Sequence, residues 1–280
     1  MNLPIQDSRL DWVTATAKHD KRGVDLLHFA TAQTYAERGL GNKLERWRFH
    51  GYEGFQSGRW RYGWGEHGAV AVASGEQAQL AAPHLAQLAD HWSRVDYAVT
   101  VLDQDDAIRP DEDYWDAWPW KDTPLKTPAS VTRIQELARG ATFSIGERSS
   151  AYYLRVYNKH HESRGDYPRG SWRWELELKQ HASEAHHARW KAGGYSQGDV
   201  LTLLATEMRR YSLPVPWRSE GTIKRAPQPH HAHDADRILG WLNRQVTPAV
   251  QFAIEARGYE AVARVLGLPT INYAEPPTVE

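Results

Sequence analysis

Two segments of this chain alternate between polar and apolar residues, which restricts each of them to a β-strand with one polar face. They run from Tyr152 to Lys159 and from Trp172 to Lys179. Side chains on a strand point to opposite faces with a period of two residues. The polar faces carry Tyr153, Arg155, Tyr157 and Lys159 on the first strand and Arg173, Glu175, Glu177 and Lys179 on the second. A tyrosine flanked by cations, beside a pair of carboxylates, supplies a nucleophile, phosphate-binding groups and oxygen ligands for a hard metal ion.

A third strand, Arg94 to Val101, contributes another carboxylate. Its polar face holds Arg94, Asp96 and Thr100, and its valines face the other way. If the three strands share one sheet and their polar faces coincide, Asp96 joins the two glutamates beside the tyrosine. The sequence alone does not establish that pairing.

These segments resemble the motifs of a known family. Gly146 to Lys159 resembles the tyrosine motif of the trans-acting rolling-circle replication initiators, which include the phage replication initiation factors. Arg173 to Lys179 resembles the Arg-x-Glu-x-Glu-x-Lys strand that follows in this family, and Arg94 to Val99 resembles a preceding Arg-Ile-Asp-Leu-Ala-Val strand. Gly51 to Phe55 and Ser74 to Glu76 are similar to the phage branch. The resemblance covers about Asp11 to Lys179, with the motifs in the expected order.

The resemblance implies that Tyr157 attacks a DNA phosphate. It would form a 5′-phosphotyrosyl link and release a 3′-OH that primes a polymerase. Asp96, Glu175 and Glu177 are then the candidate ligands of a Mg²⁺ or Mn²⁺ ion, which all-oxygen ligation suits better than zinc. Some relatives have an acidic residue at the position of Thr100, so the number of protein ligands stays open.

Arg155 and Lys159 are candidate catalytic residues because they flank Tyr157 on its own face. A free tyrosine has a pKa of roughly 10 and is a poor nucleophile at neutral pH. Neighbouring positive charge favours the phenolate, and residues two apart on a strand lie about 7 Å from each other. We therefore expect these cations to activate the tyrosine.

The expected partner is single-stranded or cruciform origin DNA. Candidate DNA contacts near the motifs are Arg148, Ser149, Arg173, Lys179 and Arg94. The resemblance also implies a host helicase and polymerase as partners, and it allows a homodimer.

Three interpretations compete for these residues. The carboxylates could instead form cross-strand ion pairs with Arg155, Lys159 or Arg94. The chain would then be a non-catalytic, sequence-specific DNA-binding protein on the same scaffold, or an ion-paired domain that binds another protein. Metal dependence and a covalent adduct separate the nickase from both alternatives.

The composition limits the class of protein and the cellular location that we expect. The chain has 280 residues, no cysteine and a net charge of −1, so it has no disulfide framework, and indiscriminate coating of nucleic acid is not expected. It has no apolar run near the roughly 20 residues of a membrane span, and we expect a cytoplasmic protein. Thirteen tryptophans include some in basic contexts such as Arg59 to Tyr62, which suit either base stacking or hairpin packing.

The expected fold is α+β, a mainly antiparallel sheet with flanking helices and a helical C-terminal region. We expect a catalytic domain at 1–213, a linker at 214–234 and a small helical region at 235–280. The expected strands are 11–17, 59–64, 69–74, 94–102, 141–146, 152–159 and 172–179. The expected helices are 24–37, 76–90, 130–139, 199–211, 235–245, 248–256 and 259–266.

Two further segments need an interpretation. The acidic insertion from Asp103 to Asp122 contains four aromatic residues and reads as a solvated loop, with a DNA-mimicking lid as the alternative. His231 and His233 form a His-x-His pair, which binds the metal in many tyrosine nickases. We reject it here because it lies in a proline-flanked run and follows the tyrosine.

Overall fold

The computed structural model describes residues 2–104, 131–136, 140–211, 213, 215–227 and 246–266. The chain divides into two compact units, Met1–Gln228 and Pro229–Glu280. The first unit contains the sheet and is described first.

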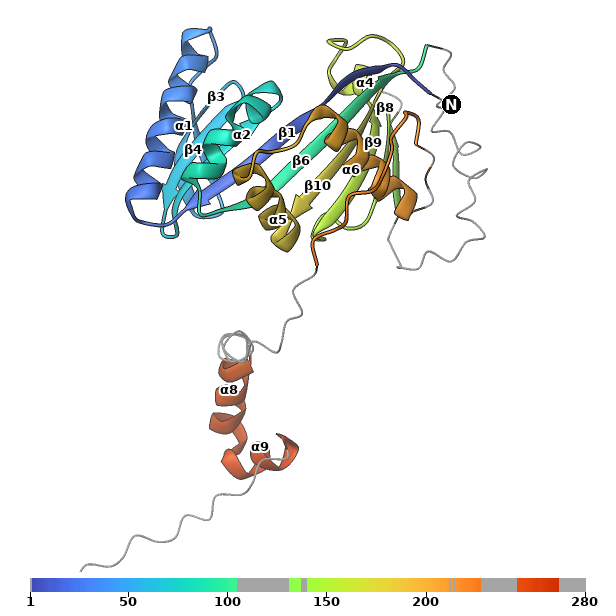
Figure 1. Cartoon of the computed structure of the whole chain (residues 1–280). Coiled ribbons are helices and arrows are strands. Elements are labelled where there is room, and N and C mark those ends of the chain that lie inside the picture. Colours follow the sequence, from blue (N-terminus) through green and yellow to red (C-terminus); the bar gives the residue numbers. More distant parts are fainter. Residues whose placement is uncertain are drawn as a thin grey trace, which may run out of the picture. The chain divides into compact units, whose positions relative to one another are not determined.

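The first unit is built on one sheet of ten strands (Figure 1). The strand order is β2-β3-β4-β5-β1-β6-β10-β9-β8-β7, and every neighbouring pair is antiparallel. The strands are β1 (Ile5–Ala17), β2 (Glu45–Phe49), β3 (Tyr52–Ser57), β4 (Trp60–Gly65), β5 (Gly68–Ser74), β6 (His91–Leu102), β7 (Val131–Glu136), β8 (Gly140–Ile145), β9 (Tyr152–Asn158) and β10 (Ser171–Lys179). The predicted α+β class with an antiparallel sheet is confirmed.

Helices cover one face of this sheet (Figure 1). They are α1 (Lys21–Gly39), α2 (Glu76–Leu88), α5 (Gln180–Lys191) and α6 (Gln197–Arg210), and the short α4 (Lys159–Glu162) follows β9 directly. Three helix starts are capped by side chains: Asp20 accepts from the first turn of α1, Asn158 accepts from the His161 backbone N–H of α4, and Ser196 and Asp199 form a capping box on α6. The opposite face of the sheet carries charged side chains, with the Trp12 ring among them.

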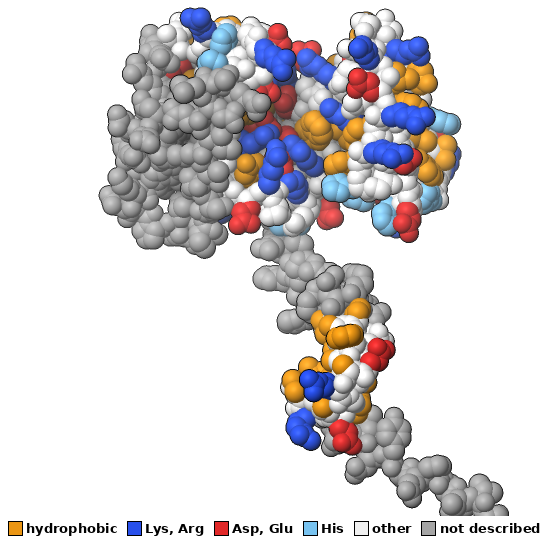
Figure 2. Space-filling view, turned by 180° about the vertical axis from the view of Figure 1, so that it is seen from behind, with side chains coloured by type: hydrophobic (Ala, Val, Ile, Leu, Met, Phe, Trp, Pro, Cys, Tyr) orange, Lys and Arg blue, Asp and Glu red, His pale blue; other side chains and the backbone are white. Residues whose placement is uncertain are grey.

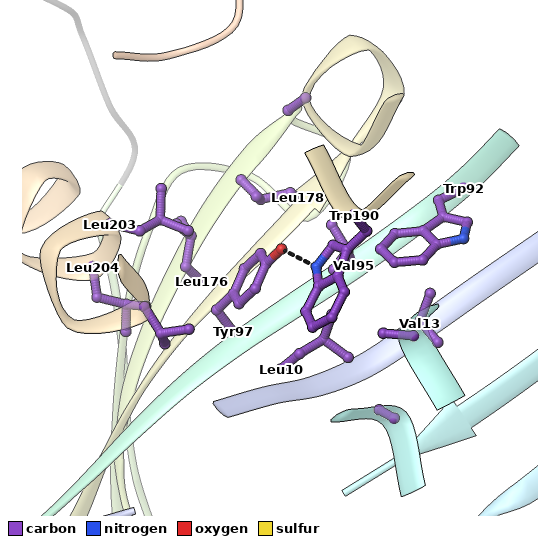
Figure 3. Close-up of a cluster of buried hydrophobic side chains, with 14 of the residues drawn as sticks. Leu10, Val13, Trp92, Val95, Tyr97, Leu176, Leu178, Trp190, Leu203 and Leu204 are labelled. Atoms are coloured by element: carbon purple, nitrogen blue, oxygen red, sulfur yellow. Dashed lines mark hydrogen bonds between the residues drawn. The ribbon is translucent and has the colours of Figure 1, made fainter. Parts of the chain in front are cut away.

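The core lies between the helices and the sheet, around Tyr97 of β6 (Figure 3). Trp190 Nε1 of α5 donates a 2.9 Å hydrogen bond to the Tyr97 hydroxyl, and leucines of α6 and β10 surround the ring. The ring and hydroxyl are fully buried. Because a buried hydroxyl without a partner costs free energy, this bond lets β6 place a tyrosine in its apolar face.

The alternation predicted for β6, β9 and β10 is confirmed. Val95 and Val99 of β6, Leu154 of β9, and Leu176 and Leu178 of β10 all belong to the core cluster. Their neighbours in sequence therefore face away from the helices, which fixes the polar face predicted for each strand.

Two predictions for the strands fail. The segment 130–139 was expected to be a helix, but Val131–Glu136 is the edge strand β7, paired with β8. It contains three β-branched residues in its first four positions, and pairing with a neighbouring strand outweighs the weak helix preference of the rest. Strands β2 and β3 were not predicted at all, although Glu45–Phe49 alternates charged and aromatic residues as a strand does.

The predicted linker does not begin where expected. The first unit extends to Gln228, so the predicted domain boundary after residue 213 lies inside it. Trp217 is 3% exposed and donates from Nε1 to the Leu201 carbonyl at 3.2 Å. Arg225 pairs with Glu207 and lies 4.0 Å from the Tyr152 ring centre. Apolar and ionic contacts thus hold this stretch against α6 and β9.

The described part of the second unit consists of α8 (Thr247–Arg257) and α9 (Tyr259–Leu266), as predicted. The predicted helix at 235–245, the histidine pair His231 and His233, and residues 105–122 of the acidic insertion lie outside the described residues. Among the described helices, none is long and apolar enough to cross a membrane.

Candidate active site

The polar faces of β6, β10 and β9 form one surface, because the strands are neighbours in that order. In the register of these pairs, Glu177 lies opposite Asp96, and Arg173 lies opposite Tyr157. Glu175 lies opposite Arg155. The convergence that the sequence left open therefore occurs. Figure 2 shows Lys, Arg and acidic side chains gathered in a hollow at the middle of this side of the sheet.

Tyr157 stands near the end of β9 and is 9% exposed. Its hydroxyl donates a hydrogen bond of 2.8 Å to Glu175 Oε2 on β10. A general base must lie within hydrogen-bond reach of the proton that it takes, about 2.6–3.2 Å. Glu175 satisfies that condition for Tyr157.

The electrostatic setting of Tyr157 differs from the expectation. Burial raises the pKa of its phenol well above 10, and the Glu175 carboxylate raises it further. Arg173 acts in the opposite direction but does not compensate. This arrangement does not show the expected lowering of the Tyr157 pKa, so the phenol needs a base to take its proton, and the catalytic role of Arg155 and Lys159 stays a prediction.

Arg155 and Lys159 nevertheless lie at the tyrosine. The Arg155 guanidinium and the Lys159 Nζ are each 5.8 Å from the Tyr157 ring centre. Arg155 forms an ion pair with Glu175, and Lys159 pairs with the exposed Glu162 in α4. Although burial opposes it, the Glu175 charge raises the pKa of Arg155, which stays a cation.

Asp96 and Glu177 share a cation. Arg94 Nη2 lies 2.8 Å from Glu177 Oε2, and Arg94 Nε donates to Asp96 Oδ1 at 2.9 Å. Lys179 forms a second ion pair with Glu177. Burial raises the pKa of Asp96 to about 8 against the lowering effect of Arg94. The ion pairs foreseen as the alternative to metal binding are therefore present for Glu175 and Glu177.

The three carboxylates fit a hard divalent ion by donor type. All their donor atoms are oxygens, and in this arrangement each carboxylate is paired with a cation. In this arrangement the described residues do not close into a group of three or more metal-binding side chains. Binding of an ion here would require the carboxylates to exchange arginine contacts for metal contacts.

Arg173 was predicted to contact DNA, but its side chain is buried inside the protein. The residue is 1% exposed. Its guanidinium donates to Asp7 and Asp11 at 3.1 Å each, to Thr100 Oγ1 at 2.9 Å and to the Tyr167 hydroxyl at 2.9 Å. Because these partners occupy its donors, Arg173 holds Asp7, Asp11, Thr100 and Tyr167 in place beneath the site and does not present its guanidinium to DNA.

Four residues of the site escaped the sequence reasoning: Asp7, Arg9 and Asp11 of β1, and Tyr167 of the loop before β10. Arg9 pairs with both aspartates, at 3.2 Å and 2.9 Å. The signal was a polar alternation over residues 7–11, at the start of a strand that we expected to begin only at residue 11. No local pattern marks Tyr167, which reaches the site through its loop.

A groove of about 990 Å³ contains most of these groups. Its lining includes Tyr157, Glu175, Arg155, Lys159 and Asp96, together with Arg94 and Arg173. The remaining predicted residues, Glu177, Lys179, Arg148 and Ser149, lie outside this lining. Lys179 Nζ donates a hydrogen bond to the Arg148 carbonyl. Lys179 and Arg148 therefore lie near the start of β9, whereas Tyr157 lies near its end.

Comparisons with known proteins agree with this fold and with the motifs of β9 and β10. A family model described as replication initiation factor matches residues 125–266, which include β9 and β10. A solved rolling-circle replication initiator protein from Geobacillus stearothermophilus has a TM-score of 0.53 to this chain at 17% identity. The match covers 73% of this chain and 85% of that one, and at this identity it establishes the fold. A search of curated proteins finds no match.

Proposed function

Because the chain belongs to the replication initiation factor family, we propose that it initiates rolling-circle replication by nicking origin DNA through Tyr157. The observation that carries this proposal is the 2.8 Å hydrogen bond from Tyr157 to Glu175 at the groove. A buried tyrosine with a carboxylate in proton-transfer reach is a nucleophile beside its base.

The reaction would proceed by in-line displacement at a DNA phosphate. Glu175 Oε2 takes the phenolic proton as Tyr157 Oη attacks phosphorus. The new Oη–P bond forms as the P–O3′ bond breaks, and the 3′ oxygen leaves and gains a proton to become a 3′-OH. The 5′ side of the strand stays linked to the tyrosine, and the 3′-OH primes synthesis by a polymerase.

Two cations next to the tyrosine would stabilise negative charge on the DNA phosphate and would contribute less to deprotonation of the phenol. Arg155 and Lys159 line the groove on either side of Tyr157. Fixed positive charges near a phosphoryl group stabilise the charge that develops in the transition state. Arg173 is a positioning residue in this proposal, because its guanidinium is buried beneath the reacting face.

The family implies a divalent metal ion, which would polarise a phosphoryl oxygen when bound. Asp96 and Glu175 are the carboxylates that line the groove, and we assign them as the residues that would hold Mg²⁺ or Mn²⁺. Glu177 would support the site from outside the groove through Arg94 and Lys179.

The second candidate is a non-catalytic, sequence-specific DNA-binding protein. The raised pKa of Tyr157 and the ion pairs on Glu175 and Glu177 favour this reading. A host helicase, a polymerase and a second copy of the chain remain proposed partners, and a cytoplasmic location remains a prediction.

The two candidates are separated by a covalent adduct. The purified chain is incubated with labelled single-stranded DNA that spans the origin of its own replicon, with Mg²⁺, Mn²⁺ or EDTA, and run on a denaturing gel beside Tyr157→Phe. The nickase gives a metal-dependent adduct that the substitution abolishes. DNA binding without an adduct under either metal would support the second candidate.

A further inference from the structure

A second polar pocket lies on β2 to β4, away from the nucleophile. It has a volume of about 220 Å³ and is lined by Asn42, Lys43, Glu45, Gln56, Ser57, Gly58 and Arg61. None of these residues belongs to the segment that matches the family model. Two of them, Lys43 and Arg61, are cations. Of the two nearby carboxylates, Glu45 accepts a 3.0 Å hydrogen bond from Gln56, and Glu37, which lies against Gly58, accepts one of 2.8 Å from Asn42.

The pocket is lined by a cation with an unused donor. Arg61 Nη1 is buried and has no hydrogen-bond partner among the described residues, while Arg61 Nε donates to Gln56 at 3.3 Å. Buried polar groups are normally hydrogen-bonded. An unused guanidinium donor beside a lysine suits an oxyanion such as a phosphate.

Two connections join this pocket to the catalytic groove. Ser57 and Gly58 of the pocket are followed by Arg59, which lines the groove, so one turn between β3 and β4 serves both. The turn needs glycine at position 58, where φ is +53° and a Cβ would meet Glu37 Oε2 at 2.1 Å.

The second connection is a stack of two arginines on one tryptophan. The Arg61 guanidinium lies 5.1 Å from the Trp12 ring centre, and the Arg94 guanidinium lies 4.9 Å from it. Trp12 and Arg94 both line the groove. A line of fixed cations therefore runs from the pocket to Asp96, and the indole holds two of them in place.

We propose that the Lys43–Arg61 pocket binds a second backbone phosphate of the DNA strand whose scissile phosphate lies at Tyr157. This inference rests on the proposed function in one respect: the proposed function identifies the molecule in the groove as a DNA strand. Five strand spacings separate β4 from β9 in the sheet, about 24 Å at about 4.8 Å per spacing. Only an extended polyanion spans that distance with one phosphate at each end.

The surface beside the pocket suits a single strand. Trp47 and Phe49 of β2 stack on each other with ring centres 5.6 Å apart, and Phe49 is 44% exposed. Trp47 lies against Gly63, where a Cβ would come within 3.3 Å of its ring. Exposed aromatic rings stack on unpaired bases, whereas a duplex keeps its bases inside. Figure 2 shows hydrophobic patches interspersed with Lys and Arg on this side of the sheet.

The test is non-covalent binding by the full chain carrying Tyr157→Phe, which removes nicking from the measurement. Fluorescence anisotropy gives the dissociation constants of labelled single-stranded oligonucleotides of roughly 4 to 16 nucleotides, the range of single-strand site sizes. Each is measured at several salt concentrations. Affinity should rise in a step when an oligonucleotide becomes long enough to reach the pocket.

The decisive variants are Lys43→Ala and Arg61→Gln, singly and together. We expect the double variant to lose the step and to lower the salt slope for long oligonucleotides by about 0.7, the contribution of one phosphate contact in a single strand. Short oligonucleotides should bind as before. The matched control is Arg46→Ala, which removes an exposed cation from the other face of β2 and should keep the step.

Three outcomes would overturn the pocket as a phosphate site: a step that survives the double variant, an equal effect from Arg46→Ala, or no step in the parent protein. Lys43 is exposed, so Lys43→Ala tests the proposal even if Arg61→Gln disturbs folding. The two proposals fail separately. If the double variant loses the step but the parent protein forms no covalent adduct with origin DNA, the pocket is supported as a phosphate site and only the nicking reaction is refuted.

Discussion

The Tyr157 hydroxyl donates a 2.8 Å hydrogen bond to Glu175 Oε2, across the pair of strands β9 and β10. The two residues are diagonal neighbours in the register, because Glu175 lies opposite Arg155 and Tyr157 lies opposite Arg173. Diagonal neighbours on a sheet lie within reach of long side chains. The bond therefore follows from the strand pairing and gives the phenol a proton acceptor in a buried setting.

Replacement of Glu175 by glutamine should slow covalent adduct formation by about 10²- to 10⁴-fold, the range for loss of a general base. Single-turnover gels with saturating DNA measure the rate. Because Glu175 is also assigned to the metal, the assay is repeated at rising Mn²⁺; loss of a ligand is rescued by excess metal, whereas loss of the base is not. Glu184→Gln, at an exposed position of α5 outside the groove, is the control. An unchanged or faster rate in Glu175→Gln would mean that another group takes the proton.

Asp96 and Glu177 should respond differently to substitution. Asp96 lines the groove, whereas Glu177 is held by Arg94 and Lys179 outside it. Glu177→Gln should raise the Mn²⁺ concentration for half-maximal cleavage by about 10- to 100-fold, as for an outer-shell partner, and Asp96→Asn should raise it more. The reverse order would assign Glu177 as the ligand.

Arg173→Met should reduce the free energy of unfolding by about 3–5 kcal/mol, the cost of removing one partner from a buried ion pair. Asp7 and Asp11 would lose one of the two cations that they share and would keep only Arg9. Urea denaturation measures the loss, and Arg46→Met, on an exposed position, should stay within about 0.5 kcal/mol. Adding Asp7→Asn and Asp11→Asn should restore part of the stability. A loss no larger than that of the control would contradict the anchoring role.

Stability should fall in acid because of His186, which packs against Tyr97 and Tyr195. Burial lowers the pKa of His186 from 6.5 to about 4. The unfolded chain therefore binds a proton below pH 6.5 that the folded chain refuses until about pH 4. At about 1.4 kcal/mol per pH unit, this group removes about 3 kcal/mol of stability across that window. Burial also lowers the pKa of His187, so protonation of this residue in the unfolded chain further reduces stability as the pH falls.

Urea denaturation between pH 7.5 and 4.5 measures this dependence. His186→Gln should flatten it, whereas His161→Gln, at an exposed position, should leave it unchanged. A parent protein whose stability does not change between pH 6.5 and 4.5 would contradict the prediction.

The strands at the centre of the sheet were predictable because their two faces have opposite character. Each of β6, β9 and β10 places valines, leucines or tryptophans toward the helices and charges on the other side, so period and face follow from the residues. The edge strand β7 has no such contrast, and its pairing with β8 decided its structure. Local propensity carries little weight where neighbours supply the hydrogen bonds.

The carboxylates of the site were predictable, but four of its other residues and its electrostatics were not. Register brought Asp96, Glu175 and Glu177 together, as the alternation suggested. The direction of the Tyr157 pKa was missed because burial and the Glu175 contact depend on distances that no sequence gives. Arg173 was missed as a buried group because its partners, Asp7 and Asp11, lie more than 160 positions away in the chain.

The central claim is that Tyr157 is the residue that becomes covalently linked to DNA, and peptide mass mapping tests it most directly. Trypsin places the three candidate regions in separate peptides: residues 149–155 contain Tyr153, residues 156–159 contain Tyr157, and residues 165–169 contain Tyr167. The adduct formed on origin DNA with Mn²⁺ is digested with nuclease and trypsin. The account predicts a nucleotide-sized mass increase on the 156–159 peptide. A modification on the peptide of Tyr153 or Tyr167, with 156–159 unmodified, would contradict it.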